Sequence, residues 1–321
     1  MDVLCVGLAV FDQLVRDVEH NLMDVDCVYV DDLQVACGGD ALNAAVNCAN
    51  MGMDTALVAR IGTDANGDFL LRYLEKKGID TRYMARNGQY PTSTTIVCIE
   101  PSGERHFMAY GKSNQALTDT DIPKEAIKSA RHVHVASVMS LLGLSFDKLE
   151  NLLRTAKAHG ATTSFDVNHD RQGHWLRRID AALHYTDIFI PSHYEAQVIC
   201  GGLQTPEEMK AFFAPYGLKV FGLKMGAKGV YLTDYKQDIY LPSLYEGKPV
   251  DTTGAGDAFF ASFISGYLRG MCLADCGVLG SAASAMVIGQ VGATTGLRPF
   301  KDALKLAAAR GYPITTGRLD G

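Results

Sequence analysis

The segment from Asp251 to Asp257 places two acids around a glycine-rich turn, Asp-Thr-Thr-Gly-Ala-Gly-Asp. Apolar residues follow it at helical spacing, so we predict a helix that begins at or near Asp257, preceded by a loop of Gly254, Ala255 and Gly256. Side chains this small let backbone N–H groups converge on one point, where the helix dipole adds roughly half a positive charge. Such a point favours a phosphate or a developing anion. An Asp at its rim is suited to accept a proton from a hydroxyl that attacks the phosphate.

The alternative is that Asp257 only caps the helix and that the glycines only form a turn, since capping aspartates are common. A second glycine-led helix start weighs against it, because the segment 38–45 carries Asp40 and, one turn later, Asn43. Asp12 lies just after the first predicted strand, where ligands bind in open α/β sheets. Together these side chains offer hydrogen-bond acceptors and a donor to a polyhydroxy compound. The residues alone leave open that Asp12 is a turn residue and Asn43 a solvated helix residue.

The segments around these residues alternate between strand-like and helix-like patterns. Apolar runs of strand length occur at 2–10, 55–62, 131–138, 161–167, 186–191 and 218–224. Helical patterns occur at 41–51, 67–78, 146–160 and 205–217, and they dominate from 255 to 310. Strands that alternate with helices indicate a layered α/β fold with a parallel sheet.

Two segments break this alternation. Residues 12–36 and 91–110 look β-rich, and the second has a turn at Pro101-Ser102-Gly103. Strands inserted in this way form a separate small sheet, suited to act as a lid over the site or as a dimer surface. We therefore predict one domain over residues 1–321, with lid segments at about 12–38 and 91–112.

The lid strands carry apolar side chains that would be adhesive if exposed, so we predict a homodimer through this sheet. These side chains are Val28, Val30, Val35, Ile96 and Cys98.

The composition excludes several classes of function. Thirty Lys plus Arg against thirty-six Asp plus Glu give a net charge of −6, and without a basic run nucleic acid is a poor candidate partner. No apolar run approaches the ~18 residues that span a bilayer, and the N-terminus lacks the basic flank of a signal peptide. The eight cysteines include no Cys-x-x-Cys pair, which favours buried reduced thiols. We expect a cytoplasmic protein without nucleic-acid or membrane partners.

Other motifs fail on inspection. Gly111-Lys112-Ser113 resembles the end of a P-loop, but His106 stands where that loop requires a glycine. No Gly-x-Gly-x-x-Gly follows the first strand, so a dinucleotide-binding site lacks its fingerprint. His132 and His134 share one face of a strand, and without a nearby carboxylate or Cys ligand we predict core histidines rather than a metal site.

The sequence resembles the ribokinase-like, or PfkB, family of carbohydrate kinases over nearly its whole length. GGDALNAAVNCANMG resembles the first family signature, and DTTGAGDAFFASFISGYL resembles the second, in which Asp, Gly-Ala-Gly and Asp recur at fixed spacing. IGTDANGDFLLRYLEKKGID, SGER, SFDVN, LKMGAKGVYL and VGATT follow in the family's order. The resemblance implies a three-layer α/β/α ribokinase-like fold with a mainly parallel central sheet and a small β-sheet lid.

The resemblance also implies transfer of the γ-phosphoryl group of ATP, bound with Mg²⁺, to a hydroxyl of a sugar or nucleoside. It makes Asp257 the catalytic base and the amides of Gly254, Ala255 and Gly256 an anion hole. It implies that the substrate contacts come from Asp12, Gly39, Asp40 and Asn43. It implies that the nucleotide side, including the phosphates, is lined by Asp166, Glu195, Lys224, Gly226 and Gly229. Many members use a monovalent cation such as K⁺ near the residues that match Asp251 and Thr253.

Two departures from the family pattern bear on the substrate. Ser192 stands where Asn is usual, three residues before Glu195, which puts the metal or phosphate role of that segment in doubt. Asp170 stands where relatives that act on sugar acids have an Arg. The absence of this Arg, together with the acidic Asp40, disfavours an anionic substrate. We therefore predict a neutral, ribose- or fructose-like monosaccharide. Arg105, on the predicted lid, is a candidate substrate contact. Because its charge could bind a phosphate, a phosphosugar substrate remains an alternative.

Two alternatives remain. A nucleoside kinase would use apolar lid residues to stack a base, for which Phe11, Phe107, Met108 and Tyr110 are candidates. A non-catalytic sugar-binding protein on the same fold would have no need for Asp257. We expect adenine recognition from the region 281–292, where no side chain marks itself by its chemistry.

Overall fold

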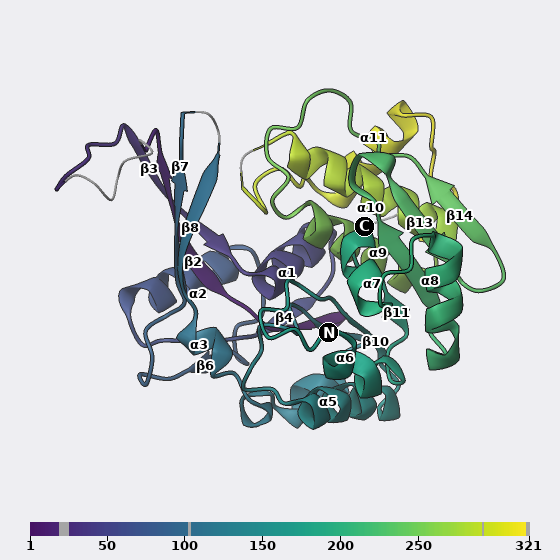
Figure 1. The fold of residues 1–321 in the computed structure, drawn as a ribbon, viewed down its shortest axis with the longest axis horizontal. Coiled ribbons are helices and arrows are strands. Elements are labelled where there is room, and N and C mark those ends of the chain that lie inside the picture. The colour runs from purple at the N-terminus through teal and green to yellow at the C-terminus, as the bar shows by residue number, and fades with distance from the viewer. Residues whose placement is uncertain (19–25, 102–103, 291, 319–321) are drawn as a thin grey trace.

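The computed structural model describes residues 1–18, 26–101, 104–290 and 292–318. Its central sheet comprises, within these residues, β1 (Val3–Val6), β4 (Thr55–Val58), β9 (His132–Val135), β10 (Thr162–Phe165), β11 (Ile188–Phe189), β12 (Val220–Lys224), β13 (Val230–Thr233) and β14 (Asp238–Leu241). Their order is β14-β13-β12-β11-β10-β9-β1-β4. All neighbours from β12 to β4 are parallel, and β13 and β14 add an antiparallel edge (Figure 1). The predicted α/β fold with a mainly parallel sheet is confirmed.

Helices cover both faces of this sheet, which explains why its strands are apolar almost without interruption. One face packs on α1 (Asp40–Asn50), α2 (Ala65–Lys76), α9 (Ala255–Leu268), α10 (Leu273–Ile288) and α11 (Phe300–Ala309). The other face packs on α4 (Lys124–Ser129), α5 (Phe146–Ala158), α6 (Leu176–Leu183), α7 (His193–Ile199) and α8 (Pro206–Phe213). The protein therefore has three layers.

The chain leaves the middle of the sheet in two directions. From β1 it passes through α1 to β4, whereas from β9 it passes through α5 to β10 and on toward β12. Because such crossovers are right-handed, opposite directions place α1 and α5 on opposite faces. The carboxyl ends of β1 and β9 therefore form a topological switch point, and ligands bind at such points in open α/β sheets.

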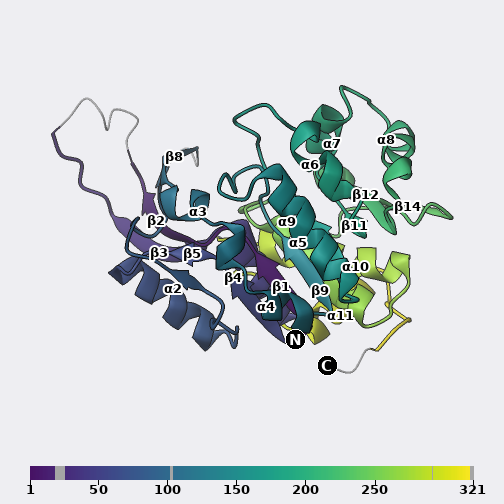
Figure 2. The same cartoon turned by 90° about the horizontal axis from the view of Figure 1, so that it is seen from below.

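A second, smaller sheet stands apart from the central one, against α2 (Figures 1 and 2). It is formed by β3 (Asp32–Gly38), β2 (Val10–Arg16), β7 (Thr94–Ile99) and β8 (Arg105–Tyr110), in that order. We call it the small sheet. β7 and β8 fall within the second predicted β-rich segment, whereas β2 begins two residues before the first segment and β3 ends two residues after it. Residues 19–25 of the first segment, and Ser102 and Gly103 of the predicted turn, lie outside the described residues.

The register of the small sheet separates its side chains into two faces, because paired residues in neighbouring strands point the same way. We define the inner face by Asp12, and pairing adds to it Thr95, Val97, Arg105 and Phe107. The outer face carries Phe11, Leu33, Val35, Ile96, Met108 and Tyr110. Three of the four candidate base-stacking residues, Phe11, Met108 and Tyr110, thus lie on the outer face, and Phe107 lies on the inner one.

The expected core histidines are confirmed. His132 bonds to the hydroxyls of Thr162 and Ser164, His134 shares the Ser164 hydroxyl, and both imidazoles are buried. Burial lowers the pKa of His132 to about 3 and lowers that of His134 as well, so both are neutral at physiological pH.

Among the described residues, the eight cysteines are free thiols, and Cys27 and Cys272 are exposed rather than buried. No helix in the described part of the chain is both long and apolar enough to cross a membrane.

Candidate active site

The glycine-rich segment begins α9 earlier than predicted. The helix starts at Ala255, so Ala255 and Gly256 form its first turn instead of a preceding loop. Gly254 makes the turn in a single residue with φ of 76°, and a Cβ placed there would lie 2.5 Å from the Cα of Ala293. In the described part of the chain, no acceptor faces the amides of Gly256 and Asp257, as is usual in a first helical turn.

Asp257 faces the start of a second helix. Asn43 Nδ2 donates a hydrogen bond of 2.9 Å to Asp257 Oδ2. Asn43 lies in the first turns of α1, which packs on α9 with the two N-termini at this point. Asp40 is the first residue of α1, and Gly39 before it has φ of 91°, where a Cβ would lie 2.6 Å from the carbonyl oxygen of Leu8. Both helix dipoles therefore point their positive ends at one spot.

Two further carboxylates are joined through Ser137, which follows β9. The Ser137 hydroxyl donates to Asp40 Oδ2, and its amide donates to Oδ1 of Asp166, which follows β10. Ser137 is fully buried and has φ of 56°, a left-handed conformation that is uncommon for residues other than glycine. Sequence reasoning missed this residue, since a single serine after a strand carries no motif.

The pKa values of these acids are raised first by burial and then by the charges of neighbouring carboxylates. Burial, followed by the charge of Asp40, raises the pKa of Asp257 to about 7. Burial also raises the pKa of Asp40, and burial with the charges of Asp40 and Asp257 raises that of Asp166 well above its usual value. Lys224 opposes all three shifts, and Glu195 adds to those of Asp40 and Asp257. The site is a carboxylate cluster beside one ammonium group.

Asp12 belongs to the same region. Burial raises its pKa to about 6 against a hydrogen bond from Thr95. A Cβ at Gly38 would lie 2.0 Å from Asp12 Oδ2, so only glycine leaves room for this carboxylate beside the start of α1. The structure thus brings Asp40 and Asn43 together with Asp257, and it places Asp12 beside Gly38 at the start of α1.

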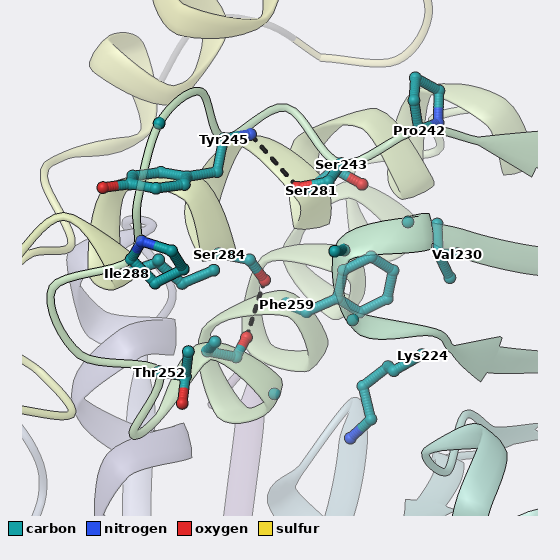
Figure 3. A pocket seen from close by; sticks show the side chains of 17 residues that line it. Lys224, Val230, Pro242, Ser243, Tyr245, Thr252, Phe259, Ser281, Ser284 and Ile288 are labelled. Atoms are coloured by element: carbon teal, nitrogen blue, oxygen red, sulfur yellow. Dashed lines mark hydrogen bonds between the residues drawn. The ribbon is translucent and has the colours of Figure 1, made fainter.

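On the other side of Lys224 lies a cavity of about 520 Å³. Figure 3 shows Lys224 at its lower edge, Phe259 at its centre and Tyr245 and Ser243 above, with Ser284 donating a 2.7 Å bond to the carbonyl of Ala255. Lys224 Nζ would lie 3.2 Å from a Cβ at Gly256, so this glycine lets the ammonium approach α9. Gly226 and Gly229 also line the cavity, as do Ser281 and Ile288 of the expected 281–292 region. The segment 242–249, which includes Ser243 and Tyr245, was not predicted from any motif.

The two departures from the family pattern have local structural roles. Ser192 and Glu195 form a capping box at the start of α7, in which Glu195 Oε2 accepts from the Ser192 amide at 2.7 Å. Asp170 accepts from the amides of Gln172 and Trp175 at 2.8 and 2.6 Å. Burial raises the pKa of Asp170, but these amides outweigh it and hold the pKa below its usual range. Asp170 therefore closes the loop before α6.

Asp251 and Thr253, predicted as ligands of a monovalent cation, contact Arg105 instead. Arg105 Nη1 donates to Asp251 Oδ1 at 2.9 Å and to Thr253 Oγ1 at 2.8 Å. The carboxylate of Asp251 also accepts hydrogen bonds from two backbone amides. The Thr253 amide donates to Oδ1 at 2.8 Å and the Gly292 amide to Oδ2 at 2.9 Å. A cation at these oxygens would stand against a fixed guanidinium charge, so the residues do not fit a monovalent cation.

Comparison with known proteins gives a consistent result. The model of the family described as "pfkB family carbohydrate kinase" matches residues 1–299. An ATP-dependent 6-phosphofructokinase of Thermoanaerobacterium thermosaccharolyticum is 30% identical over 95% of this chain and 92% of its own. A ribokinase of Staphylococcus aureus is 28% identical over 91% of this chain and 94% of its own. A crystal structure of an Escherichia coli protein in complex with ATP and Mg²⁺ superposes with a TM-score of 0.84 at 22% identity, over 96% of this chain and 99% of that one.

Proposed function

The chain belongs to the pfkB family of carbohydrate kinases, which are phosphotransferases with an alcohol acceptor, and we propose the reaction that it catalyses. We propose that it transfers the γ-phosphoryl group of ATP to a hydroxyl of a neutral monosaccharide. The observation that carries the proposal is the position of Asp257. Its carboxylate has a pKa of about 7 and lies in the first turn of α9, beside unpaired amides and within 2.9 Å of Asn43. A base with this pKa is matched to proton transfer at neutral pH.

The proposed reaction uses the groups around Asp257 in distinct roles. Asp257 takes the proton of the attacking acceptor hydroxyl. The oxygen of that hydroxyl forms a bond to the γ-phosphorus, while the bond between the γ-phosphorus and the oxygen of the leaving ADP breaks. The amides of Gly254, Gly256 and Asp257, with the dipole of α9, stabilise the charge on the moving phosphoryl group. The Ala255 amide, which the resemblance also placed in the anion hole, donates to the carbonyl of Thr252 at 3.3 Å. Lys224 stands between the cavity and the carboxylate cluster, where it is suited to bind the terminal phosphates.

The acceptor is proposed to be neutral because of the charges that surround it. Asp12 and Asp40 accept hydrogen bonds from sugar hydroxyls, and Asn43 fixes the orientation of Asp257 while offering its carbonyl oxygen. An acceptor with a carboxylate or phosphate near these acids would meet repulsion in a partly dry site. Arg105, the cation expected to relieve such repulsion, is engaged by Asp251 and Thr253.

The proposed cofactors are ATP and Mg²⁺. Burial, with the charges of neighbouring carboxylates, raises the pKa values of Asp40, Asp166 and Asp257. A divalent cation would stabilise their ionised forms, and carboxylate oxygens are the ligands that Mg²⁺ prefers. Asp166 and Glu195 would hold the ion from the side facing Lys224. When bound, Mg²⁺ neutralises charge on the phosphates. K⁺ is not part of the proposal, since Arg105 stands where it would bind.

The small sheet is proposed to act as a lid and as a dimer surface within one kinase domain. Its outer face exposes Leu33, Val35, Met108 and Tyr110, with exposed fractions of 59, 48, 50 and 38%. Apolar strands this exposed favour pairing with a second copy. Light scattering at micromolar concentration should give a dimer, and Val35→Lys with Met108→Lys should give a monomer. A wild-type monomer would contradict the proposal.

Phe107 favours a nucleoside as the second candidate acceptor. Its side chain is 64% exposed on the inner face of the small sheet, where it is placed to stack on a flat base. The other three candidate stacking residues lie on the outer face, which weakens this alternative.

A coupled assay of ADP release with Mg²⁺ tests the proposal and separates the candidates. The panel contains ribose, fructose, fructose 6-phosphate, a sugar acid and adenosine. We expect turnover with a neutral sugar at a kcat/KM at least about tenfold above that of every other class. Preference for adenosine would replace the first candidate with the second. Absence of ADP release across the panel, with sugar binding retained by calorimetry, would favour a non-catalytic sugar-binding protein.

A further inference from the structure

Arg105 joins the small sheet to the segment that precedes α9. It lies at the start of β8 on the inner face, and its two acceptors, Asp251 and Thr253, are 146 and 148 residues away in sequence. The contact therefore joins two parts of the molecule that no local structure holds together. Thr253 directly precedes Gly254, so the contact ends at the turn from which the amides of α9 begin.

Asp251 is the buried end of this contact. Its side chain is 4% exposed, against 29% for that of Arg105. The amides of Thr253 and Gly292 donate hydrogen bonds to its carboxylate, but they carry no net charge. The guanidinium of Arg105 supplies a full positive charge beside it. Burial raises the pKa of Asp251, and the amides of Gly292 and Thr253, with Arg105, outweigh burial and keep the pKa below its usual value. Without Arg105 a nearly buried carboxylate would lack its counter-charge, which is costly.

We infer that Arg105 takes the place of the monovalent cation that the family resemblance implies beside Asp251 and Thr253. Arg105 thereby ties closure of the small sheet to the order of the phosphate-binding turn. The inference rests on the proposed function, because the role of that turn in phosphoryl transfer is part of it. Arg105 is a positioning residue, since it acts through Thr253 and the turn at Gly254. The wild-type enzyme then needs no K⁺, because its cation is supplied by a strand of the small sheet.

The first test compares turnover in KCl and in tetramethylammonium chloride at equal ionic strength. The wild-type kcat should differ by less than about twofold between the two salts, because exchanging the cation at fixed ionic strength leaves general screening unchanged. Arg105→Ala should lose about 100-fold in kcat in tetramethylammonium, since a displaced turn misplaces the phosphoryl group. K⁺, or guanidinium at low millimolar concentration, should restore at least about tenfold by filling the vacated site. Arg105→Lys, which keeps the charge, should lose less and gain no K⁺ response.

Arg16→Ala is the matched control. Arg16 lies on the same face of the small sheet, but its partner is Asp32 of the same sheet, at 3.5 Å. This variant should behave as the wild type in both salts. A wild-type enzyme that requires K⁺ overturns the inference. An Arg105→Ala variant that keeps full activity, or that responds to neither K⁺ nor guanidinium, also overturns it.

A second measurement does not depend on turnover. The Tm of the wild type should be the same in the two salts, whereas K⁺ should raise the Tm of Arg105→Ala by binding to the exposed Asp251 site. If the wild type phosphorylates no acceptor, the proposed function fails while this measurement still tests the role of Arg105. A K⁺-dependent Tm in the wild type, or none in Arg105→Ala, counts against the inference.

Discussion

The proposed acceptor side and the proposed nucleotide side of the site are built from different kinds of residues. The proposed acceptor side carries Asn43 and three carboxylates, those of Asp12, Asp40 and Asp257. Burial is the largest cause that raises the pKa of each carboxylate, and the charges of Asp40 and Glu195 add to the shift of Asp257. The nucleotide side is a cavity of about 520 Å³ lined by glycines, hydroxyls and apolar side chains, and among the described residues that line it Lys224 is the charged one.

If the proposed roles hold, the protein recognises the acceptor by directional hydrogen bonds and the nucleotide by the shape of the cavity. Fixed carboxylates and an amide distinguish the positions of individual hydroxyls, because an unpaired buried polar group is costly. A cavity lined by hydroxyls and backbone holds a flat base without demanding a particular edge. Loss of a group on the acceptor side should therefore abolish chemistry, whereas changes on the nucleotide side should change affinity or backbone geometry.

The strongest test of this contrast is Asp257→Asn. The variant keeps a hydrogen bond with Asn43 but loses the proton acceptor, so kcat should fall about a thousandfold. Sugar affinity measured by calorimetry should change little, because the shape of the site is retained. Asp68→Asn, on an exposed pair with Arg86, is the control and should keep full activity. Undiminished turnover of Asp257→Asn would remove the basis of the proposed mechanism.

A backbone change at the junction of the two sides should have the next largest effect. Gly254→Ala adds a Cβ 2.5 Å from the Ala293 backbone at φ of 76°, so the turn must move. We expect a loss of about 100-fold in kcat/KM, because the amides no longer meet the phosphoryl group.

Gly78→Ala separates collision from backbone strain. Gly78 has nearly the same φ, 74°, but nothing lies within 4 Å of its added Cβ. It should lose about 1 kcal/mol of stability and no activity. If Gly254→Ala and Gly78→Ala both retain wild-type kcat/KM, the turn at Gly254 is not part of the phosphate site.

Sequence patterns predicted the parts of the molecule that local spacing determines. The strands and helices of the α/β layers follow from apolar periodicity, and α9 follows from the glycines before a helical pattern. Its start was misplaced by two residues because the helix begins within the glycine segment itself, where Gly254 turns the chain in one residue. The Ser192–Glu195 capping box was not predicted, although its Ser-x-x-Glu spacing is the signature of one.

Contacts between distant segments carried no such signal. Arg105 was predicted to contact substrate, yet its partners lie 146 and 148 residues away, and no pattern along the chain indicates them. Ser137 joins Asp40 and Asp166 only because β9 lies between β1 and β10 in the sheet. The nucleotide-side loop 242–249 was missed for a related reason, since a surface that recognises shape needs no particular residue type.

The selectivity for the nucleotide base tests whether the cavity discriminates less strictly than the acceptor side does. Ser243, Ser281 and Tyr245 line the cavity, and a hydroxyl either donates or accepts, so the edges of adenine and guanine are both tolerated. We expect kcat/KM for GTP within about tenfold of that for ATP, while epimers of the accepted sugar differ by at least about 100-fold. Steady-state kinetics with both panels measures the two ratios. Rejection of GTP as strong as rejection of sugar epimers would contradict the contrast.

The smallest expected effect is on the free energy of unfolding. It measures how much the buried, ionised carboxylate of Asp257 destabilises the folded protein. The pKa of Asp257 is raised to about 7 in the folded protein, against 3.8 as a reference, so the folded state binds this proton more tightly than the unfolded chain does. The free energy of unfolding therefore falls as pH rises from about 4 to about 7, and the loss persists above that range. Asp257→Asn removes an ionised group that burial and the charges of Asp40 and Glu195 disfavour. Without nucleotide or Mg²⁺, its Tm should exceed that of the wild type by about 2–6 °C at pH 8. The excess should shrink at pH 5, whereas Asp68→Asn should show no such trend. An excess that is equal at both pH values would mean that burial and the neighbouring charges do not raise the pKa of Asp257 in the folded protein.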